Sequence, residues 1–187
     1  MISQPGREGA RGAVGKNLDR TVGGHVDEDR RVGPSASHGE LVDAEKRYRA
    51  RGRERRDGQD VVQDDQCRAV SGTWYSEYDG LTIDSASRID IDHVVPLKEA
   101  WRSGASQWST PERRAFANDL VDSQLIAVSA GSNRGKGDKD PGNWKPPLQS
   151  YRCAYSRAWI SVKATYRLTA NPAEAEALSG MLDTCDV

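Results

Sequence analysis

The large aromatic side chains of this 187-residue chain are confined almost entirely to its last two thirds. Residues 59–187 hold 11 of the 12 aromatic residues and all three cysteines, whereas residues 1–58 hold one aromatic residue and 10 of the 18 glycines. Burial of apolar surface must offset the entropy lost on folding, and the first segment has too little to bury. The sequence therefore predicts a disordered or non-native segment over 1–58 and one folded domain over 59–187.

The charge composition argues against a module that binds nucleic acid through charge alone. The formal net charge is −1 at pH 7, and residues 59–187 contain more acidic than basic residues. A passive nucleic-acid-binding domain normally has a basic balance. Between Pro141 and Ala173 there are basic residues and no acidic residue, which indicates a cationic face near the C-terminus. These residues are Lys145, Arg152, Arg157, Lys163 and Arg167.

The pattern of apolar and turn residues after residue 70 predicts a mixture of short strands and helices, with no internal repeat. Alternating residues on both sides of Asp79-Gly80 predict a hairpin over Ser71–Asp84. Two further strands are expected, at Arg88–Val95 and Gln124–Val128. The glycine-rich stretch 129–147 predicts a loop with at most a short helix. A short helix is expected at Leu97–Arg102, and further helices from a Ser109 cap to about Asp119, at Gln149–Leu168, and from Pro172 to about Leu182. The Gln149–Leu168 helix has a core-facing apolar stripe at helical spacing, formed by Tyr151, Tyr155, Trp159, Val162 and Tyr166.

The three cysteines lack the paired spacing of a metal site. Cys153 flanks a predicted helix and Cys185 lies two residues from the end, which suits a disulfide that ties down the C-terminus. Reduced thiols are the alternative from spacing alone, and Cys67 has no evident partner. No apolar run reaches the about 18 residues of a membrane-spanning helix. The first residues also lack the apolar stretch of a secretory signal.

The stretch IDIDHVVPL, residues 89–97, places two acids and a histidine in a short apolar strand. Such groups cost desolvation free energy if they are buried, so a functional reason is worth seeking. The order strand, strand and polar loop brings Asp92, His93 and Asn133 within reach of one site. Oxygens of Asp and Asn suit a hard cation such as Mg²⁺, and a neutral histidine can accept a proton from water. This set predicts metal-assisted hydrolysis of a phosphodiester.

Each of these residues also has a structural interpretation. A strand histidine is commonly a satisfied structural residue, and Asp92 can simply bond to its neighbours. Asn133 can cap a helix or occupy a left-handed turn before Gly135. Lys136 and Lys139 can be solvated loop charges. Taken singly, none of the residues favours chemistry, and only the ordered set does.

The motifs DHVVPL, AWRSGA, FAND, LIAV, NRGKGDKDP and NWKPP occur in this order. Together with SGTWYSEYDG, YRCAY and LSGMLDTC, they make residues 57–187 resemble the HNH endonuclease family. More narrowly, the chain is similar to small secreted-type bacterial members related to the nuclease domain of GmrSD restriction enzymes. The resemblance implies an α+β fold with a ββα-metal (His-Me finger) core, an N-terminal β-hairpin and C-terminal helices. It also implies one divalent cation, with Mg²⁺ as the expected ion.

The resemblance implies a role for each matching residue. His93 matches the general base, and Asp92 and Asn133 match the metal ligands. The central amide that orients the base is expected nine residues before Asn133, where this chain has Gln124, and Asn118 is the other candidate. The Gln side chain is longer than that of Asn, so its amide would reach His93 with a different geometry. Phosphate contacts are expected from Arg134, Lys136, Lys139 and Lys145.

The function implied is a metal-dependent endonuclease of low sequence specificity, acting on nucleic acid and on DNA rather than RNA. No membrane partner is expected, and the sequence gives no evidence of an oligomer. The alternative is a catalytically impaired ββα domain that binds nucleic acid or protein, which the replacement at Gln124 favours. The cysteines and the resemblance predict secretion, whereas the lack of a signal-like apolar stretch in the first residues favours a cytoplasmic protein.

The abrupt change in composition before residue 57 has a further interpretation. Relatives of this type usually carry a cysteine in an N-terminal helix, and this chain has arginine- and glycine-rich sequence there instead. We hypothesise that residues 1–55 are not the native N-terminal part of the fold, because of a wrong start site or a shifted reading frame. Cys67 would then have lost its partner.

Overall fold

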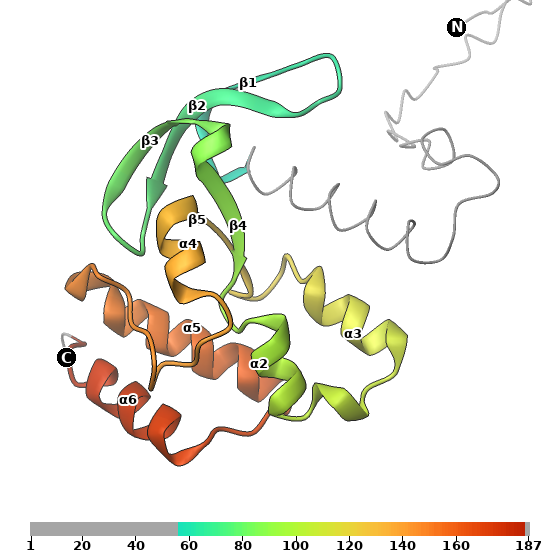
Figure 1. Ribbon diagram of the computed structural model, residues 1–187, viewed down its shortest axis with the longest axis vertical. Coiled ribbons are helices and arrows are strands. Elements are labelled where there is room, and N and C mark those ends of the chain that lie inside the picture. The colour runs from blue at the N-terminus through green and yellow to red at the C-terminus, as the bar shows by residue number, and fades with distance from the viewer. Residues whose placement is uncertain (1–55, 186–187) are drawn as a thin grey trace, which may run out of the picture. The chain divides into compact units, whose positions relative to one another are not determined.

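A computed structural model describes residues 56–185 of the chain, and the expectations for residues 1–55 lie outside this part. The described part has an α+β fold with two small antiparallel sheets and helices at one end (Figure 1). The α+β class expected from the sequence is confirmed.

The first sheet contains three strands in the order β1 (Gln59–Gln63), β2 (Ala69–Ser76) and β3 (Leu81–Ser85). The β2–β3 pair is the predicted hairpin, with Trp74 opposite Ile83. Gly80 in the connection has a φ of 75°, a conformation that glycine adopts without steric cost. Trp74 and Ile83 are buried in a small cluster with Ile89 and Ala127 of the second sheet, so this cluster joins the two sheets.

The second sheet pairs β4 (Ile89–His93) antiparallel with β5 (Leu125–Ser129). Helix α4 (Ala130–Lys136) follows β5 directly and contacts both strands. The Ser129 side chain accepts a hydrogen bond from the Ser132 amide, which caps the start of the helix. Two strands and a short helix are thus packed together where the sequence predicted two strands and a polar loop.

Four further helices cover the other end of the fold, close to the predicted positions. Helices α3 and α6 each begin with a capping box, at Ser109 with Glu112 and at Asn171 with Glu174. Helix α5 ends earlier than the sequence pattern indicates, because Arg167 turns the chain at a φ of 52°. Their bounds are α2 Leu97–Arg102, α3 Thr110–Ala117, α5 Arg152–Thr165 and α6 Pro172–Leu182.

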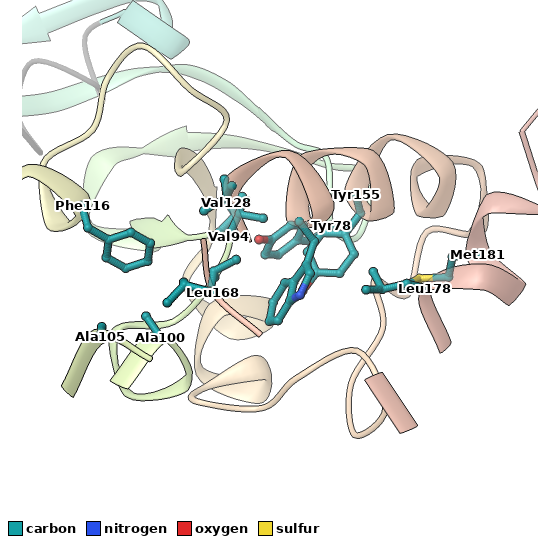
Figure 2. Packing of buried hydrophobic residues seen from close by; sticks show 13 residues of the cluster. Tyr78, Val94, Ala100, Ala105, Phe116, Val128, Tyr155, Leu168, Leu178 and Met181 are labelled. Atoms are coloured by element: carbon teal, nitrogen blue, oxygen red, sulfur yellow. The ribbon is translucent and has the colours of Figure 1, made fainter. Parts of the chain in front are cut away.

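The main core lies between the second sheet and helices α5 and α6 (Figure 2). The predicted apolar stripe of α5 is confirmed, since Tyr155, Trp159 and Val162 are fully buried. The Tyr155 ring meets the Tyr78 ring edge-on, with centroids 5.6 Å apart. Tyr78 follows β2, so this contact connects the first sheet to the helices that carry the C-terminus.

Of the five basic residues expected on a cationic face between residues 141 and 173, Lys163 is buried instead. Lys163 is only 5% exposed, and its Nζ lies 3.1 Å from a Glu99 oxygen and 2.6 Å from a Glu174 oxygen. The sequence around Lys163 contains no acid, but α2 and α6 each bring one to it. This part of the prediction is wrong because the pairing partners are distant in sequence.

The predicted disulfide is confirmed. Cys153 on α5 is joined to Cys185, with their Cα atoms 5.1 Å apart. Cys67 is an exposed free thiol in the connection between β1 and β2. Of the helices between residues 56 and 185, none has the length and apolar character needed to cross a bilayer.

Candidate functional site

The site predicted from the sequence lies where β4 ends. Successive side chains of a strand point to opposite faces, so Asp90 and Asp92 share one face and His93 lies on the other. The two acids face α4, as their contacts below show. The strand ends at His93, two residues before the expected end at Val95 and three before Pro96.

Asp92 is almost completely buried, with 5% of its surface exposed. Its Oδ2 atom accepts a hydrogen bond from the Tyr78 hydroxyl at 2.6 Å and another from the Lys136 ammonium group at 2.7 Å. Burial, together with the negative charge of Asp92, raises the pKa of Tyr78 well above its usual range. Tyr78 therefore remains a neutral donor to the carboxylate.

Lys136, the last residue of α4, is fully buried. Its Nζ donates to Asp92 and also to the backbone carbonyl of His93, 2.7 Å away. Burial lowers the pKa of Lys136, and the charge of Asp92 opposes this effect. The sequence predicted a surface lysine in contact with phosphate, but the structure places this ammonium group inside the fold.

His93 is half-buried, and its ring is held by helix α3. The Nε2 atom lies 2.9 Å from the backbone carbonyl of Ala117, the last residue of α3. A carbonyl oxygen can only accept, so Nε2 carries the proton. In the neutral ring the lone pair is then on Nδ1, the nitrogen that could accept a proton from water.

The two amide residues considered for orienting the histidine bond to backbone groups instead. Gln124 is fully buried; its Oε1 accepts from the Val95 amide at 3.1 Å and its Nε2 donates to the Val95 carbonyl at 2.9 Å. Asn118 caps α3 by donating to the Arg114 carbonyl at 2.9 Å. Gln124 therefore fixes the segment just after His93, while the imidazole itself is held by Ala117.

Asn133 lies one helical turn before Lys136 and faces a different acid. Its Nδ2 donates to an Asp90 carboxylate oxygen at 3.0 Å, and the exposed Arg134 lies 3.8 Å from the same oxygen. Asn133 and Lys136, three residues apart on the helix, thus lie opposite Asp90 and Asp92, two residues apart on the strand. The structure joins Asp92 to Lys136 and Asp90 to Asn133.

The sequence reasoning missed Asp90 and Tyr78 as members of this cluster. A signal for Asp90 was present, because its two-residue spacing from Asp92 puts both on one face. No local signal pointed to Tyr78, which is 14 residues away from its partner Asp92.

Asp92 and Asn133 each have an oxygen of the kind that binds a hard divalent cation. Among the described residues, no donor bonds to Oδ1 of Asp92 or Oδ1 of Asn133, and both are hard oxygen ligands. No group of three or more His, Cys, Asp and Glu side chains within residues 56–185 could hold a metal ion. A cation here would complete its coordination with water and phosphate. The Lys136 ammonium group beside Asp92 opposes a further positive charge.

The other residues expected to contact phosphate lie at the surface, on α4 and in the segment that follows it. Arg134, Lys139 and Lys145 are exposed. Lys139 Nζ lies 2.7 Å from the Gly135 carbonyl, so its charge sits at the negative end of the helix. These three cations remain accessible to a polyanion.

Comparisons with known proteins agree with the arrangement of motifs. A family model described as the C-terminal domain of GmrSD restriction endonucleases matches residues 45–181. A protein of Arthroderma benhamiae, described as an uncharacterized secreted protein, is 57% identical over 131 residues, which cover 70% of this chain and 64% of that protein. No solved structure matches the chain. The chain therefore belongs to the family of the C-terminal domain of GmrSD restriction endonucleases.

Proposed function

We propose that this domain hydrolyses phosphodiester bonds within nucleic acid, with His93 as the general base. The observation that carries the proposal is the contact between His93 Nε2 and the Ala117 carbonyl. This contact fixes the ring and leaves the basic lone pair on Nδ1. Membership of a family named for restriction endonucleases supports nucleic acid as the substrate.

The backbone around His93 is held from both sides. Lys136 bonds to the His93 carbonyl, and Gln124 bonds to both polar backbone groups of Val95. A base held in one orientation gives a larger rate advantage than a mobile one. The role proposed for Gln124 is thus to position the strand end.

A divalent cation, with Mg²⁺ the ion expected, would be held by Asp92 and Asn133. When bound, it would stabilise the charge that develops on the phosphate. Arg134, Lys139 and Lys145 would hold the neighbouring phosphates as point charges. Contacts of this kind do not read bases, so we propose low sequence specificity, with DNA as the preferred substrate.

A second candidate function is a catalytically impaired domain that binds nucleic acid or protein. The specific observation in its favour is the buried pair of Asp92 and Lys136, which places a cation where a metal ligand is expected. In this case the domain would bind a strand without cutting it.

A nicking assay separates the two functions. Supercoiled plasmid and a structured RNA would each be incubated with the full chain, with Mg²⁺ or with excess chelator. We expect Mg²⁺-dependent nicking that His93→Ala reduces by at least about 100-fold, the usual contribution of a general base. The matched control is His38→Ala, a histidine in the segment that the sequence predicts to lie outside the domain.

Several results would contradict the nuclease proposal. Chelator-resistant nicking would exclude the proposed metal, and full activity of His93→Ala would exclude the proposed base. Binding of plasmid without any nicking by the folded protein would support the second function.

We also propose that the protein acts outside the cytoplasm. The disulfide between Cys153 and Cys185 and the relative described as secreted support this location.

A further inference from the structure

An exposed tryptophan of α2, Trp101, lies against Arg113 of α3, and these two residues define an aromatic surface. Trp101 on α2 is 52% exposed, although it is one of the largest apolar side chains of the domain. The guanidinium carbon of Arg113, on α3, lies 5.6 Å from the centre of the indole ring. One side of the ring is therefore covered by a cation, while about half of the residue remains open to solvent.

Arg113 is held in place beneath this surface. It donates to the Trp108 carbonyl and, at 3.4 Å, to the Thr110 hydroxyl. A guanidinium group stacked on an indole is attracted to the electron-rich ring face, and these hydrogen bonds restrict its motion. The indole is therefore presented by a preorganised support.

This surface is connected to His93 through α3. The Ala117 carbonyl, which accepts from His93, belongs to a residue one helical turn after Arg113. Four residues of helix rise by about 6 Å. Helix α2 begins four residues after His93, and the last residue of α3 contacts the His93 ring. Each helix therefore has one end near the end of β4 (Figure 1). Trp101 lies four residues into α2. Four residues of extended chain span at most about 14 Å and four of helix about 6 Å, so the Cα atoms of His93 and Trp101 lie within about 20 Å of each other, a distance that a short strand can span.

The charge around Trp101 suits a polyanion. Lys98 and Arg102 are exposed on the same helix and share one carboxylate, that of Asp138. Arg102 also bonds to Glu99, whose other oxygen is paired with Lys163. Arg113 adds a third cation to Lys98 and Arg102, and the accessible acids near them are Asp138 and, on α3, Glu112. Cations therefore outnumber accessible acids by three to two at this surface.

We propose that Trp101, supported by Arg113, is a stacking platform for an unpaired base of the nucleic-acid strand that the site at His93 holds. This inference rests on the proposed function and specifies its substrate class. Both faces of a base inside a duplex are covered by its neighbours, so an exposed indole can stack on such a base only when it is unpaired or flipped out. The preferred substrate is therefore a single strand, a flap or a melted end.

Binding can be measured with the full chain carrying His93→Ala, so that the probe is not cut. The probes are a fluorescent oligothymidylate strand and a blunt duplex of equal length, read by anisotropy. We expect Trp101→Ala to weaken single-strand binding by about tenfold, because stacking of one base has an effect of this size. Trp101→Phe should retain most of the affinity, and duplex binding should change by less than about twofold.

The matched control is Tyr75→Ala, which removes another half-exposed aromatic side chain, on β2. We expect it to leave both affinities unchanged. Circular dichroism and Tm establish that each variant is folded. Unchanged single-strand affinity of folded Trp101→Ala overturns the platform, and so does an equal loss for strand and duplex.

The same experiment separates this proposal from the proposed function. If the protein with His93 intact cuts nothing, but Trp101→Ala selectively weakens single-strand binding, the platform stands without the nuclease. If the protein nicks nucleic acid and Trp101→Ala cuts and binds single strands as the parent does, the nuclease stands without the platform.

Discussion

Two donors from distant parts of the chain meet on one carboxylate oxygen of the buried Asp92. Tyr78 precedes it by 14 residues and Lys136 follows it by 44. An isolated carboxylate in this position would be strongly destabilising. The pair with Lys136 offsets that cost, and the hydroxyl of Tyr78 adds a neutral bond.

Removing one member of this pair should therefore be costly. We expect Lys136→Met to lower the free energy of unfolding by about 3–5 kcal/mol, because it leaves Asp92 buried without a cation. Adding Asp92→Asn should recover part of this loss, since no unpaired charge remains. Urea denaturation provides the measurement.

The neighbouring lysine supplies the control for this test. Lys139→Met removes an exposed ammonium group and should change the unfolding free energy by less than about 0.5 kcal/mol. Equal effects at the two lysines would show that Lys136 does not carry the pairing described above.

For single residues, the sequence identified candidates for the site but did not predict most of their contacts. The apolar alternation of IDIDHVVPL predicted a strand over Arg88–Val95, and the observed strand, Ile89–His93, lies within it. The burial of Lys136 was not predictable, since a lysine between glycines is typical of a solvated loop and its partners are remote in sequence. For the same reason the backbone contacts of Gln124 could not be read from its position alone.

The helices were predictable because their ends carry local signals. Serine or asparagine caps with a glutamate three residues later identify the starts of α3 and α6. The apolar spacing of α5 predicted its buried face. Helix α4 was harder to recognise, because its seven residues include two glycines and no apolar stripe.

The cap of α6 gives a prediction that belongs to one element. Asn171→Ala removes the side chain that accepts from the Glu174 amide at 3.0 Å and donates to Asp140 at 2.7 Å. We expect a loss of about 1–2 kcal/mol in the free energy of unfolding, measured by urea denaturation. Ser179→Ala, at an exposed position of the same helix, should have little effect. A similar loss for both variants would mean that the cap is not the cause.

The link between α2 and the loop after α4 gives a pH dependence. Lys98 and then Arg102 hold the pKa of Asp138 at about 2, below its ordinary value of 3.8. A carboxyl group whose pKa is lowered by folding stabilises the protein above its ordinary pKa, and this stabilisation disappears as the pH falls toward the lowered value.

We therefore expect Asp138→Asn to lower Tm near neutral pH and to have no effect as the pH approaches 2. The effect should be small, because the Asp138 side chain is 45% exposed. Asp84→Asn, at a carboxylate that is 90% exposed, is the control and should leave Tm unchanged over the same range. A Tm difference for Asp138→Asn that persists at the lowest pH would contradict the assignment.

In the part of the molecule that the structure describes, most aromatic side chains contribute to the core, with Tyr78, Tyr155 and Trp159 fully buried. Tyr75 and Trp101 are the exceptions, since each is about half exposed. Lys163 was wrongly expected on a cationic face, because counting charges along the chain ignores the acids that other elements bring to it. Glu99 and Glu174 reach Lys163 from helices that precede and follow it.

The disulfide should contribute to the stability of the whole domain. It closes a loop with a sequence separation of 32 residues. We expect the double variant Cys153→Ser/Cys185→Ser to lose about 3–4 kcal/mol of unfolding free energy, as loop closure predicts. Cys67→Ser removes the exposed free thiol and should be neutral. Equal stability of the double variant and the parent would contradict this account.

The position of that disulfide also determines what a single peptide-bond cleavage can do. Any one cut between Cys153 and Cys185 divides the backbone yet leaves the two pieces covalently joined. A protease that opened the segment between α5 and α6 would produce a nicked protein of unchanged mass apart from one added water. The break would become visible as two bands only after reduction, so in an oxidising environment the domain can keep its last helix despite such damage.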